Sequence, residues 1–444
     1  MWEGRGAMSK WSQQSPQTFV ENLRVGGHRR TCVLWDVEAQ RARAFGSAGA
    51  ELAAYLTGEC PDFDAHEAVF LEVGRESGAL FGAFLHRTQR GQAQGGLRRW
   101  HYETLADFLR DGLRLARAMG RKNALAGLWW GGGKGLIARP LDERNTRDPE
   151  FRRLLYCEYG DFVSSLRGAY VTAEDAGTTP QDVACVFERT RFATCIPPEF
   201  GGSGNPSRAT AVGVVCAMEA ALDFLGLGSL SGKRVAMQGG GNVGAFMLEC
   251  LLEKDVKGIV VSEISSERVQ WLRSRFADAR VSVRACAPGD NSILAENCDV
   301  LAPNALGEVI RPETIPILAA RVVCGGANNP LADDERDGEA LRARGICYVP
   351  DFVCNRMGIV SCANEQYGRV SNDPDSERQL GRDYENSIWN SVQRVLRRAE
   401  EESVTPFAAA DRLAAELSRE PHPIFGHRTR RIVAGLIADH WERG

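Results

Sequence analysis

The segment Arg234-Val235-Ala236-Met237-Gln238-Gly239-Gly240-Gly241-Asn242-Val243-Gly244 carries the clearest structural signal in this chain. An apolar strand ends at Gln238 and runs into the pattern Gly239-x-Gly241-x-x-Gly244, which opens a helix. In such a unit the first glycine permits the tight turn, the second lets the backbone approach a pyrophosphate, and the third lets helix pack on strand. The free amides at the start of the helix complete a phosphate site. The segment predicts a Rossmann-type dinucleotide-binding domain, with a glycine-rich turn that holds no ligand as the alternative.

A carboxylate follows at the distance that a nucleotide site requires. Glu263 ends the next apolar strand, nineteen residues beyond Gly244, where it can accept hydrogen bonds from the adenosine ribose hydroxyls. Because a carboxylate at this place repels a 2′-phosphate, we expect NAD as the cofactor, with NADP less favoured. Arg268 is close enough in the sequence to keep NADP open as an alternative.

Short apolar strands alternate with helices around this segment, which is typical of a parallel sheet. The segment Ser203-Gly204-Asn205-Pro206-Ser207 has the composition of a hinge. Beyond the hinge we expect helices at 210–225, 243–252 and 266–276 and strands at 234–238, 258–261, 300–302, 321–324 and 347–349. After Asp351 the pattern becomes mostly helical.

The expected fold class is α/β with two domains. Residues 1–205 would form an N-terminal α/β substrate and oligomerisation domain, and residues 206–351 would form the Rossmann domain. The helices of residues 352–444 would return to complete the first domain, because the chain must cross back near Pro350.

Within the first domain, apolar runs predict strands at 31–35 and 68–73 and a helix near 48–56. Apolar positions at helical spacing predict a further helix over 102–119. Gly120 follows it as a helix-stop signal.

Two lysines and an aspartate indicate a second, catalytic site. Lys134 closes the run Gly131-Gly132-Gly133-Lys134, and Lys122 lies twelve residues before it. A buried lysine beside another cation has a lowered pKa, because desolvation and like charge both disfavour its protonated form, and it can act as a general base. A second lysine that stays charged can hold a substrate carboxylate. Asp175 adds a carboxylate in a turn-like segment; surface lysines and a loop aspartate are the alternative.

Bulk composition limits the functional classes. The chain has 444 residues, 43% hydrophobic and 25% charged, which is typical of a globular protein of more than one domain. A net charge of -4 leaves no overall basic footprint, so we expect no nucleic-acid partner. No stretch approaches the roughly 18 apolar residues of a membrane helix, so we expect no membrane partner. The 13 cysteines lack metal-ligand spacing, which predicts no metal site and free thiols in a reducing, cytoplasmic location.

Eight motifs follow one another in a fixed order. They are Gly95-Gly96-Leu97-Arg98, Met119-Gly120-Arg121-Lys122-Asn123-Ala124, Gly131-Gly132-Gly133-Lys134, Thr172-Ala173-Glu174-Asp175-Ala176-Gly177-Thr178-Thr179, Ser203-Gly204-Asn205-Pro206, Gln238-Gly239-Gly240-Gly241-Asn242-Val243-Gly244, Ala302-Pro303-Asn304-Ala305-Leu306-Gly307 and Gly326-Ala327-Asn328. Over residues 91–441 the chain resembles the glutamate/leucine/phenylalanine/valine dehydrogenase family, and its motifs are closest to the leucine/phenylalanine dehydrogenase type. So many ordered motifs are far more specific than any single one.

The resemblance implies oxidative deamination of an L-amino acid to a 2-oxo acid and ammonia, or the reverse reductive amination, with NAD as cofactor. By it, Lys122 would bind the substrate carboxylate, Lys134 would activate the attacking water, and Asp175 would carry protons to and from the amino group. The other substrate contacts would come from Gln94, Gly95, Gly96 and Asn355. The cofactor would be held by Gly239, Gly241, Asn242, Val243, Gly244, Glu263, Asn304 and Asn328. Family members are oligomers built through the first domain, so a homo-oligomer that binds small molecules is expected.

The chain departs from the family pattern around the substrate. The family's Asn-Ala-Gly-Gly-Val loop appears here as Asn355-Arg356-Met357-Gly358-Ile359, so two small residues have become large. Gln94 stands where glutamate-specific members carry a lysine and leucine-type members an apolar residue. Glu385 either adds to a polar pocket or faces solvent, and Trp129-Trp130 forms either core packing or a pocket wall. These departures predict a substrate that is neither glutamate nor plainly leucine, such as an aromatic or polar amino acid.

Two other functions stay open on sequence alone. A catalytically retired homologue could bind nucleotide or amino acid as a sensor or assembly subunit, because a fold does not fix a function. The Arg356-Met357 change favours this reading, and the presence of Lys122, Lys134 and Asp175 opposes it. The other is a Rossmann oxidoreductase that acts on a substrate without an amino group.

Overall fold

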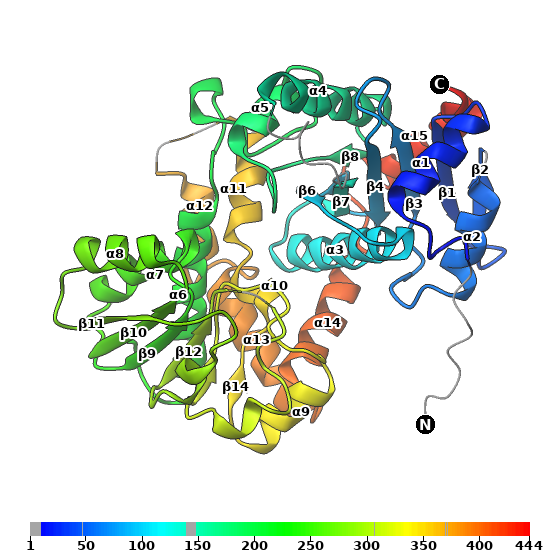
Figure 1. The fold of residues 1–444 in the computed structure, drawn as a ribbon. Coiled ribbons are helices and arrows are strands. Elements are labelled where there is room, and N and C mark those ends of the chain that lie inside the picture. The colour runs from blue at the N-terminus through cyan, green and yellow to red at the C-terminus, as the bar shows by residue number, and fades with distance from the viewer. Residues whose placement is uncertain (1–9, 47, 139–147, 306, 369, 371) are drawn as a thin grey trace.

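The computed structural model describes residues 10–46, 48–138, 148–305, 307–368, 370 and 372–444, which fold into two lobes around two β-sheets (Figure 1). Leu306, which belongs to one of the eight motifs, lies outside these residues. The α/β fold class expected from the sequence is confirmed, since each sheet is covered by helices.

The first sheet has eight mixed strands in the order β2-β1-β3-β4-β7-β5-β8, and β6 also pairs with β7. Its strands are β1 (Arg30–Asp36), β2 (Arg41–Phe45), β3 (Ala68–Val73), β4 (Leu80–His86), β5 (Ala93–Gln94), β6 (Leu97–Trp100), β7 (Gly131–Ala138) and β8 (Tyr170–Val171). The pairs among β1 to β4 and β7 are antiparallel, whereas β5 and β6 run parallel to β7. The central strand β7 carries the glycine run and Lys134.

Helices cover both faces of this sheet. They are α1 (Pro16–Val25), α2 (Gly49–Gly58), α3 (Leu105–Leu125), α4 (Pro149–Ser165) and α5 (Pro180–Phe187). Apolar residues of α1, α2 and α3 form one core with the sheet, and those of α4 and α5 form a second core on the opposite face. Burial of these two apolar faces holds the lobe together.

The helix α3 brings Lys122 to the space between the lobes. A reciprocal capping box between Thr104 and Asp107 fixes its start. The expected stop at Gly120 is wrong, because α3 continues to Leu125. A Cβ at Gly120 would lie 3.3 Å from His86 Nδ1 and 3.4 Å from Gly132 Cα. The glycine therefore allows a close approach of helix to strand, and this packing overrides its low helix propensity.

The second sheet is parallel throughout, in the order β11-β10-β9-β12-β13-β14. Its strands are β9 (Arg234–Gln238), β10 (Gly258–Glu263), β11 (Val281–Ala285), β12 (Val300–Pro303), β13 (Val322–Val323) and β14 (Cys347–Tyr348). Its helices are α6 (Ser207–Phe224), α7 (Asn242–Glu253), α8 (Ser266–Arg275) and α9 (Arg336–Ala343). The strand order reverses between β9 and β12, and ligands of such sheets bind beyond the carboxyl ends of the strands at this point.

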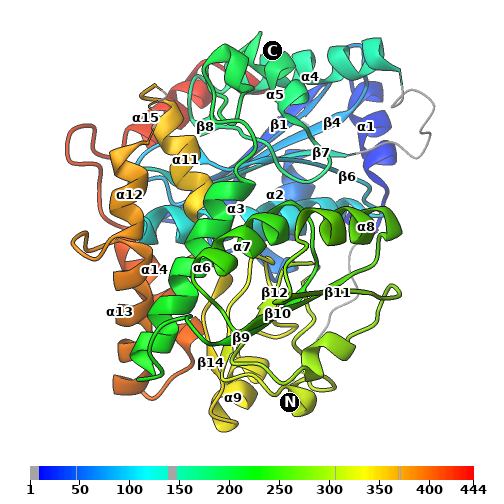
Figure 2. The same ribbon diagram turned by 90° about the vertical axis from the view of Figure 1, so that its left-hand side faces the viewer.

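The C-terminal helices serve both lobes. They are α10 (Asp351–Cys354), α11 (Met357–Glu365), α12 (Pro374–Leu380), α13 (Ile388–Glu401), α14 (Pro406–Leu417) and α15 (Arg428–Ala438). Buried residues of α13 and α14 share a core with α6, and α14 also packs on α3. The helix α15 returns to the first lobe (Figure 2). Just beyond it, the ring centroid of Trp441 lies 5.0 Å from that of Phe70 on β3.

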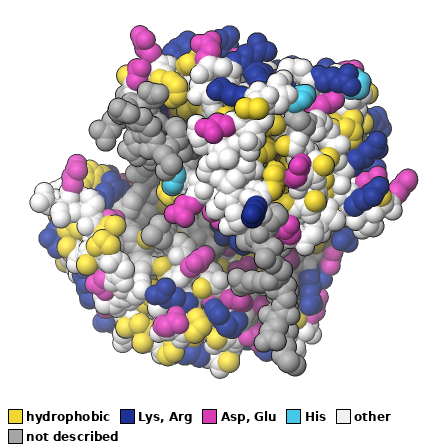
Figure 3. Space-filling view, turned by 45° about the vertical axis from the view of Figure 1, so that its right-hand side comes forward, with side chains coloured by type: hydrophobic (Ala, Val, Ile, Leu, Met, Phe, Trp, Pro, Cys, Tyr) yellow, Lys and Arg dark blue, Asp and Glu magenta, His cyan; other side chains and the backbone are white. Residues whose placement is uncertain are grey.

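The surface carries both signs of charge. Figure 3 shows acidic and basic side chains interspersed over one face of the molecule. Among the residues that the structure describes, no helix combines the length and the apolar character needed to cross a bilayer. All thirteen cysteines are free, as their scattered positions predicted.

Candidate active site

Lys134 and Asp175 form the centre of the site. The side chain of Lys134 is 4% exposed, and its Nζ donates a 2.6 Å hydrogen bond to Asp175 Oδ2. The preceding glycines allow this placement, since a Cβ at Gly132 would lie 2.3 Å from the Ala116 carbonyl oxygen and one at Gly133 would lie 2.9 Å from the Gln94 nitrogen. The backbones of α3 and β5 thus approach β7 more closely than any side chain would permit.

Burial and neighbouring charges shift both partners. Burial lowers the pKa of Lys134, and the positive charge of Arg98 lowers it further, although Asp175 opposes both effects. Burial favours a higher pKa for Asp175, but Lys134 and Arg98 outweigh it and hold that pKa well below its usual range. Asp175 is therefore ionised near neutral pH. The neutral amine of Lys134 forms at a lower pH than the neutral amine of a surface lysine.

Arg98, to which no role was assigned from the sequence, completes this charge cluster. Its Nε donates to Asp175 Oδ2 at 3.2 Å, and its Nη1 donates to both Asp111 carboxylate oxygens at 3.2 Å. The hydroxyl of Tyr102 donates to Asp111 Oδ2 at 2.8 Å. The position of Arg98, two residues after Gly96, was a usable signal, because alternate residues of an extended segment face the same side.

Glu174, directly before Asp175, is a second residue that the sequence analysis left without a role. Its Oε2 is buried and has no hydrogen-bond partner among the described residues. Burial and the negative charge of Asp175 raise the pKa of Glu174 to about 7. Near neutral pH this carboxyl group is therefore partly protonated.

Lys122 reaches the site from α3 and connects the two lobes. Its Nζ donates to Asn328 Oδ1 at 3.0 Å, and Asn355 Nδ2 donates to the same oxygen at 2.9 Å. Burial lowers the pKa of Lys122, and the negative charge of Asp351 opposes this shift. Asn328 follows β13, so a residue of the second lobe accepts the hydrogen bond of a lysine of the first. Asn355, which follows α10, supports that acceptor.

The turn between β9 and α7 has the geometry of a phosphate site. Gly239 has φ +99°, and a Cβ at Gly244 would lie 2.5 Å from the Gly239 carbonyl oxygen. A Cβ at Gly241 would meet no atom within 4 Å, and the start of α7 has no side-chain cap. The first glycine thus makes the turn and the third makes the helix–strand contact, while the helix amides face open space.

Two charged side chains border this turn. Glu263 Oε2 accepts a hydrogen bond from the Gly240 amide at 3.0 Å, which fixes the carboxylate at the end of β10. Arg268 Nε donates to the Gly240 carbonyl at 2.8 Å, and its Nη2 donates to the Gly241 carbonyl at 3.0 Å. Asn304 Oδ1 accepts from the Gly326 amide at 2.7 Å, which braces the adjoining loop. The acceptor carboxylate of Glu263 at the end of β10 fits a dinucleotide with a free ribose 2′-hydroxyl.

One cavity of about 460 Å³ joins residues of both lobes. The assigned site residues that line it are Gln94, Gly96, Lys122, Lys134, Asp175, Val243, Asn328 and Asn355, and Arg356 of the divergent loop lines it as well. Gly95 does not line it; its carbonyl accepts from the Tyr170 hydroxyl at 2.6 Å. The remaining cofactor candidates, Gly239, Gly241, Asn242, Gly244, Glu263 and Asn304, lie outside the lining, in the second lobe.

The structure answers the questions left open at the substrate end. The guanidinium of Arg356 is fully buried and turns away to the Leu125 carbonyl (2.7 Å), the Asn386 carbonyl and Ser391 Oγ (3.1 Å). Burial lowers its pKa to about 9. The side chain of Glu385 is 80% exposed and pairs with Arg394 at 3.1 Å, so it faces solvent.

The two tryptophans take different roles. Trp130 is buried in a small apolar cluster with Ala173 and Cys195, and Trp129 is half-exposed beneath the guanidinium of Arg90. Neither ring lines the cavity that holds Lys134.

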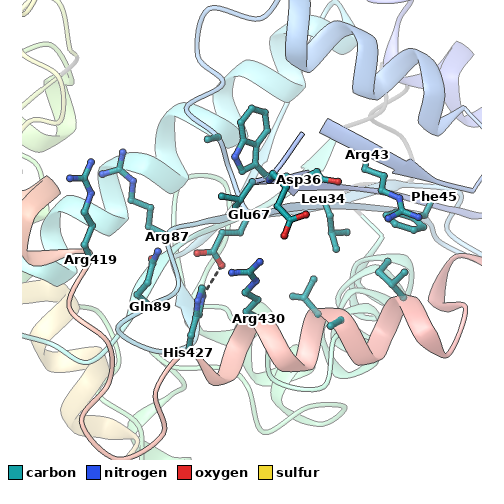
Figure 4. Close-up of a pocket in the computed structure, with 17 residues that line it drawn as sticks. Leu34, Asp36, Arg43, Phe45, Glu67, Arg87, Gln89, Arg419, His427 and Arg430 are labelled. Carbon is teal, nitrogen blue, oxygen red and sulfur yellow. Dashed lines mark hydrogen bonds and ion pairs between the residues drawn. The ribbon is translucent and has the colours of Figure 1, made fainter. Parts of the chain in front are cut away.

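A separate pocket of about 570 Å³ lies on the first lobe, between β1, β2 and α15. In this pocket His427 Nε2 lies 3.2 Å from Glu67 Oε2. Figure 4 shows this pair with Arg430 beside it and Arg43 at the opposite end of the pocket. This pocket contains none of the residues that the sequence analysis assigned to catalysis. Within the described residues no group of three or more His, Cys, Asp or Glu side chains could hold a metal ion.

Two family models match this chain. The model described as Glutamate/Leucine/Phenylalanine/Valine dehydrogenase matches residues 201–420. The model described as Glu/Leu/Phe/Val dehydrogenase, dimerisation domain, matches residues 70–192. Together they cover most of the chain and both lobes.

Individual proteins match over similar lengths. The leucine dehydrogenase of Geobacillus stearothermophilus is 38% identical over 356 residues, which cover 80% of this chain and 90% of that protein. The valine dehydrogenase of Streptomyces coelicolor is 38% identical over 82% of this chain and 94% of that protein. The crystal structure of the L-tryptophan dehydrogenase from Nostoc punctiforme has a TM-score of 0.65 at 30% identity, over 80% of this chain and 96% of that one.

Proposed function

This chain belongs to the glutamate/leucine/phenylalanine/valine dehydrogenase family, and from that membership we propose how its own residues deaminate an amino acid. The protein is an NAD-dependent dehydrogenase that converts an L-amino acid to a 2-oxo acid and ammonia, or runs the reverse amination. The observation that carries the residue assignment is the 2.6 Å contact between Lys134 and Asp175, in a cavity that also holds Lys122.

The second lobe would hold NAD through the β9–α7 turn. The open space at Gly241 and the uncapped start of α7 suit the pyrophosphate. Glu263 would accept the ribose hydroxyls, and Asn304 and Asn328 would face the nicotinamide side. Bound NAD supplies the hydride acceptor of the reaction.

Lys122 would hold the α-carboxylate of the substrate. An ammonium group has three donors, so Lys122 can keep its bond to Asn328 and still donate to a carboxylate. Asn355, bonded to the same Asn328 oxygen, would keep this arrangement fixed. The substrate α-carbon is then oriented before reaction, which reduces the entropy lost in the transition state.

Lys134 and Asp175 would move the protons. The Asp175 carboxylate takes a proton from the substrate ammonium, so that a neutral amine is present when the α-carbon is oxidised. The Lys134 amine then takes a proton from the water that attacks the imine carbon. Asp175 returns its proton to the amino group of the resulting carbinolamine. As that group leaves as ammonia, the carbinolamine hydroxyl gives its proton to the Asp175 carboxylate and becomes the 2-oxo group. Because burial and Arg98 lower the pKa of Lys134, its neutral amine forms more readily than that of an exposed lysine and can act as the base.

A spectrophotometric assay tests this proposal. The wild-type protein should reduce NAD with an L-amino acid and oxidise NADH with a 2-oxo acid only when ammonia is present. Lys134→Ala should lower kcat by about 10²- to 10⁴-fold, the range for loss of a general base, while NAD binding by fluorescence titration stays intact. Activity that survives Lys134→Ala would contradict the role of Lys134 as the base. No turnover by the wild type, together with ligand binding that Lys134→Ala leaves unchanged, would favour a nucleotide or amino-acid sensor. NADH oxidation without ammonia would favour a substrate that lacks an amino group.

The substrate is proposed to be an amino acid other than glutamate. Gln94 takes the place of the lysine that glutamate-specific members carry, and Arg356 turns its cation away from the cavity. A side-chain carboxylate would therefore meet no added cation at this end. Best turnover of 2-oxoglutarate in a screen of 2-oxo acids with NADH and ammonia would contradict the proposal.

The domain boundaries, assembly and location are proposed as follows. Residues 1–205 with 352–444 would form the substrate and oligomerisation domain, and residues 206–351 the NAD domain. The match to a dimerisation-domain model supports a homo-oligomer built through the first lobe, which light scattering of the purified protein would measure. Thirteen free cysteines support a reducing, cytoplasmic location.

A further inference from the structure

Gln94 is a buried amide without a hydrogen-bond partner. Its side chain is 0% exposed, and it lies on β5 between Gly132 of β7 and Val171 of β8. Neither its Nε2 nor its Oε1 has a partner among the residues that the structure describes. A buried donor and a buried acceptor that are both left unpaired oppose folding, so their presence in a cavity calls for an explanation, and a ligand that pairs with them is one.

The same side chain lines the cavity that holds Lys134 and Asp175. Its neighbours in that lining include Ala173, Cys195, Ile359 and Cys362, which belong to one buried apolar cluster, with Met119 packed against it. Part of the lining is thus apolar, and the unpartnered amide of Gln94 belongs to the same cavity, whose polar lining also includes Glu174, Thr178, Asn205 and Thr210. A pocket of this kind favours a substrate side chain that is apolar except for one hydrogen-bonding group at its end.

The basic side chains of this cavity have other partners. Lys134 is bonded to Asp175, Lys122 to Asn328, and the guanidinium of Arg356 to the Leu125 carbonyl. A second carboxylate on the substrate would satisfy Gln94 Nε2 but would place its negative charge against Gln94 Oε1. An indole N–H would satisfy Oε1 and leave Nε2 unpaired, and an aliphatic side chain would satisfy neither atom.

We infer that Gln94 selects an L-amino acid whose side chain ends in an uncharged group that both donates and accepts hydrogen bonds. A carboxamide satisfies both atoms of Gln94 at once through a paired, two-bond contact, and a hydroxyl does so through its single oxygen. The carboxamide is the better match, because it offers its donor and its acceptor on two atoms, as Gln94 does. This inference rests on the proposed dehydrogenase function.

The experiment compares kcat/KM for the oxidation of L-glutamine, L-asparagine, L-homoserine, L-leucine, L-tryptophan and L-glutamate with NAD. In the wild type we expect a carboxamide substrate to lead and to exceed leucine by at least tenfold. In Gln94→Leu we expect the order to reverse, with the carboxamide substrate losing on the order of 10²-fold or more, as a site does when a substrate polar group is left unpaired. Leucine should gain in the same variant.

Three results would overturn the inference. They are a wild-type preference for leucine, tryptophan or glutamate, an equal loss for all substrates in Gln94→Leu, and a gain for leucine without a loss for the carboxamide. Turnover of none of the amino acids would instead reject the proposed function itself, so the two failures are distinguishable.

Gln379→Leu is the matched control. Gln379 is also a buried glutamine, but it lies on α12, outside the cavity, and donates to the Ala126 carbonyl at 2.8 Å. Gln379→Leu should lower Tm and leave the order of substrates unchanged. Gln94→Leu should instead raise Tm in the absence of substrate, because it removes two unpaired buried atoms. A lower Tm for Gln94→Leu would show that the amide stabilises the fold and would contradict the inference.

Discussion

Lys122 Nζ donates a 3.0 Å hydrogen bond to Asn328 Oδ1, and this bond joins the last turn of α3 in the first lobe to the loop after β13 in the second. Asn355 Nδ2 donates to the same oxygen, so three side chains form one polar connection between the lobes. The lysine proposed to hold the substrate carboxylate is therefore already oriented by the lobe proposed to hold the cofactor. Substrate position and cofactor position are set by one group of contacts.

The first prediction concerns this lysine. Lys122→Met should raise KM for the amino acid by about 10- to 150-fold, because a hydrogen bond to a charged group contributes roughly 1.5–3 kcal/mol. The change in kcat should be smaller, since the carboxylate is not the reacting group. Steady-state kinetics measure both. Lys254→Met is the control, because Lys254 pairs with Glu219 away from the cavity; an unchanged KM in Lys122→Met would contradict the assignment.

The second prediction concerns the influence of Arg98 on Lys134. Because the positive charge of Arg98 lowers the pKa of Lys134, Arg98→Met should raise that pKa. In the proposed mechanism the neutral amine of Lys134 is the active form. The part of the pH profile in which kcat/KM rises with pH should therefore move to higher pH. Arg98→Lys should shift it less. Arg114→Met is the control, since Arg114 shares the partner Asp111 but does not contact Asp175; a limb that stays in place in Arg98→Met would reject the coupling.

The third prediction concerns Glu174 and stability. Burial and Asp175 raise the pKa of Glu174 to about 7 in the folded protein, from an unfolded value near 4.5. Between these two values the folded state binds more protons than the unfolded state, so the contribution of Glu174 to stability falls as pH rises from about 4.5 to about 7. Glu174→Gln should remove this loss and raise Tm more at pH 8 than at pH 5. Equal Tm changes at both pH values would argue against the raised pKa.

The fourth prediction concerns Arg356. Arg356→Ala restores the small residue of the family's loop, yet it should destabilise this protein. It leaves the Leu125 and Asn386 carbonyls and Ser391 Oγ without their donor, and each unpaired buried group costs roughly 1–3 kcal/mol. Urea unfolding should show a loss on the order of 3 kcal/mol or more. Arg342→Ala removes an exposed pair with Glu339 and should change stability by less than about 1 kcal/mol.

Local signals in the sequence were sufficient for most of the fold. The strand that ends at Gln238, its glycine turn and Glu263 lie within thirty residues of one another, and periodicity and turn chemistry act over such distances. Gly120 was misread because its role depends on His86 and Gly132, which lie on strands that the helix meets only after folding. A helix-stop signal is a local preference, and tertiary packing can override it.

The residues that share the cavity were predictable as a set, but their geometry was not. The motifs placed Lys122, Lys134 and Asp175 in one site, yet the bonds of Arg98 to Asp175 and Asp111 span 77 and 13 residues. The direction of the Arg356 side chain also depends on contacts far away in the chain, at Leu125 and Asn386. Sequence pattern gives the type of such residues, whereas their direction depends on long-range packing.

The three glycines before Lys134 are positions that cannot accept mutation, whereas other positions in the cavity lining can. An added methyl group at Gly131, Gly132 or Gly133 would collide with neighbouring backbone, so even alanine there should displace the lysine that follows. The apolar part of the cavity lining, which includes Ile359 and Cys362, is built from side chains and not from glycine backbone. A directed-evolution library for new amino-acid products should therefore randomise Gln94, Ile359 and Cys362 and keep the three glycines before Lys134.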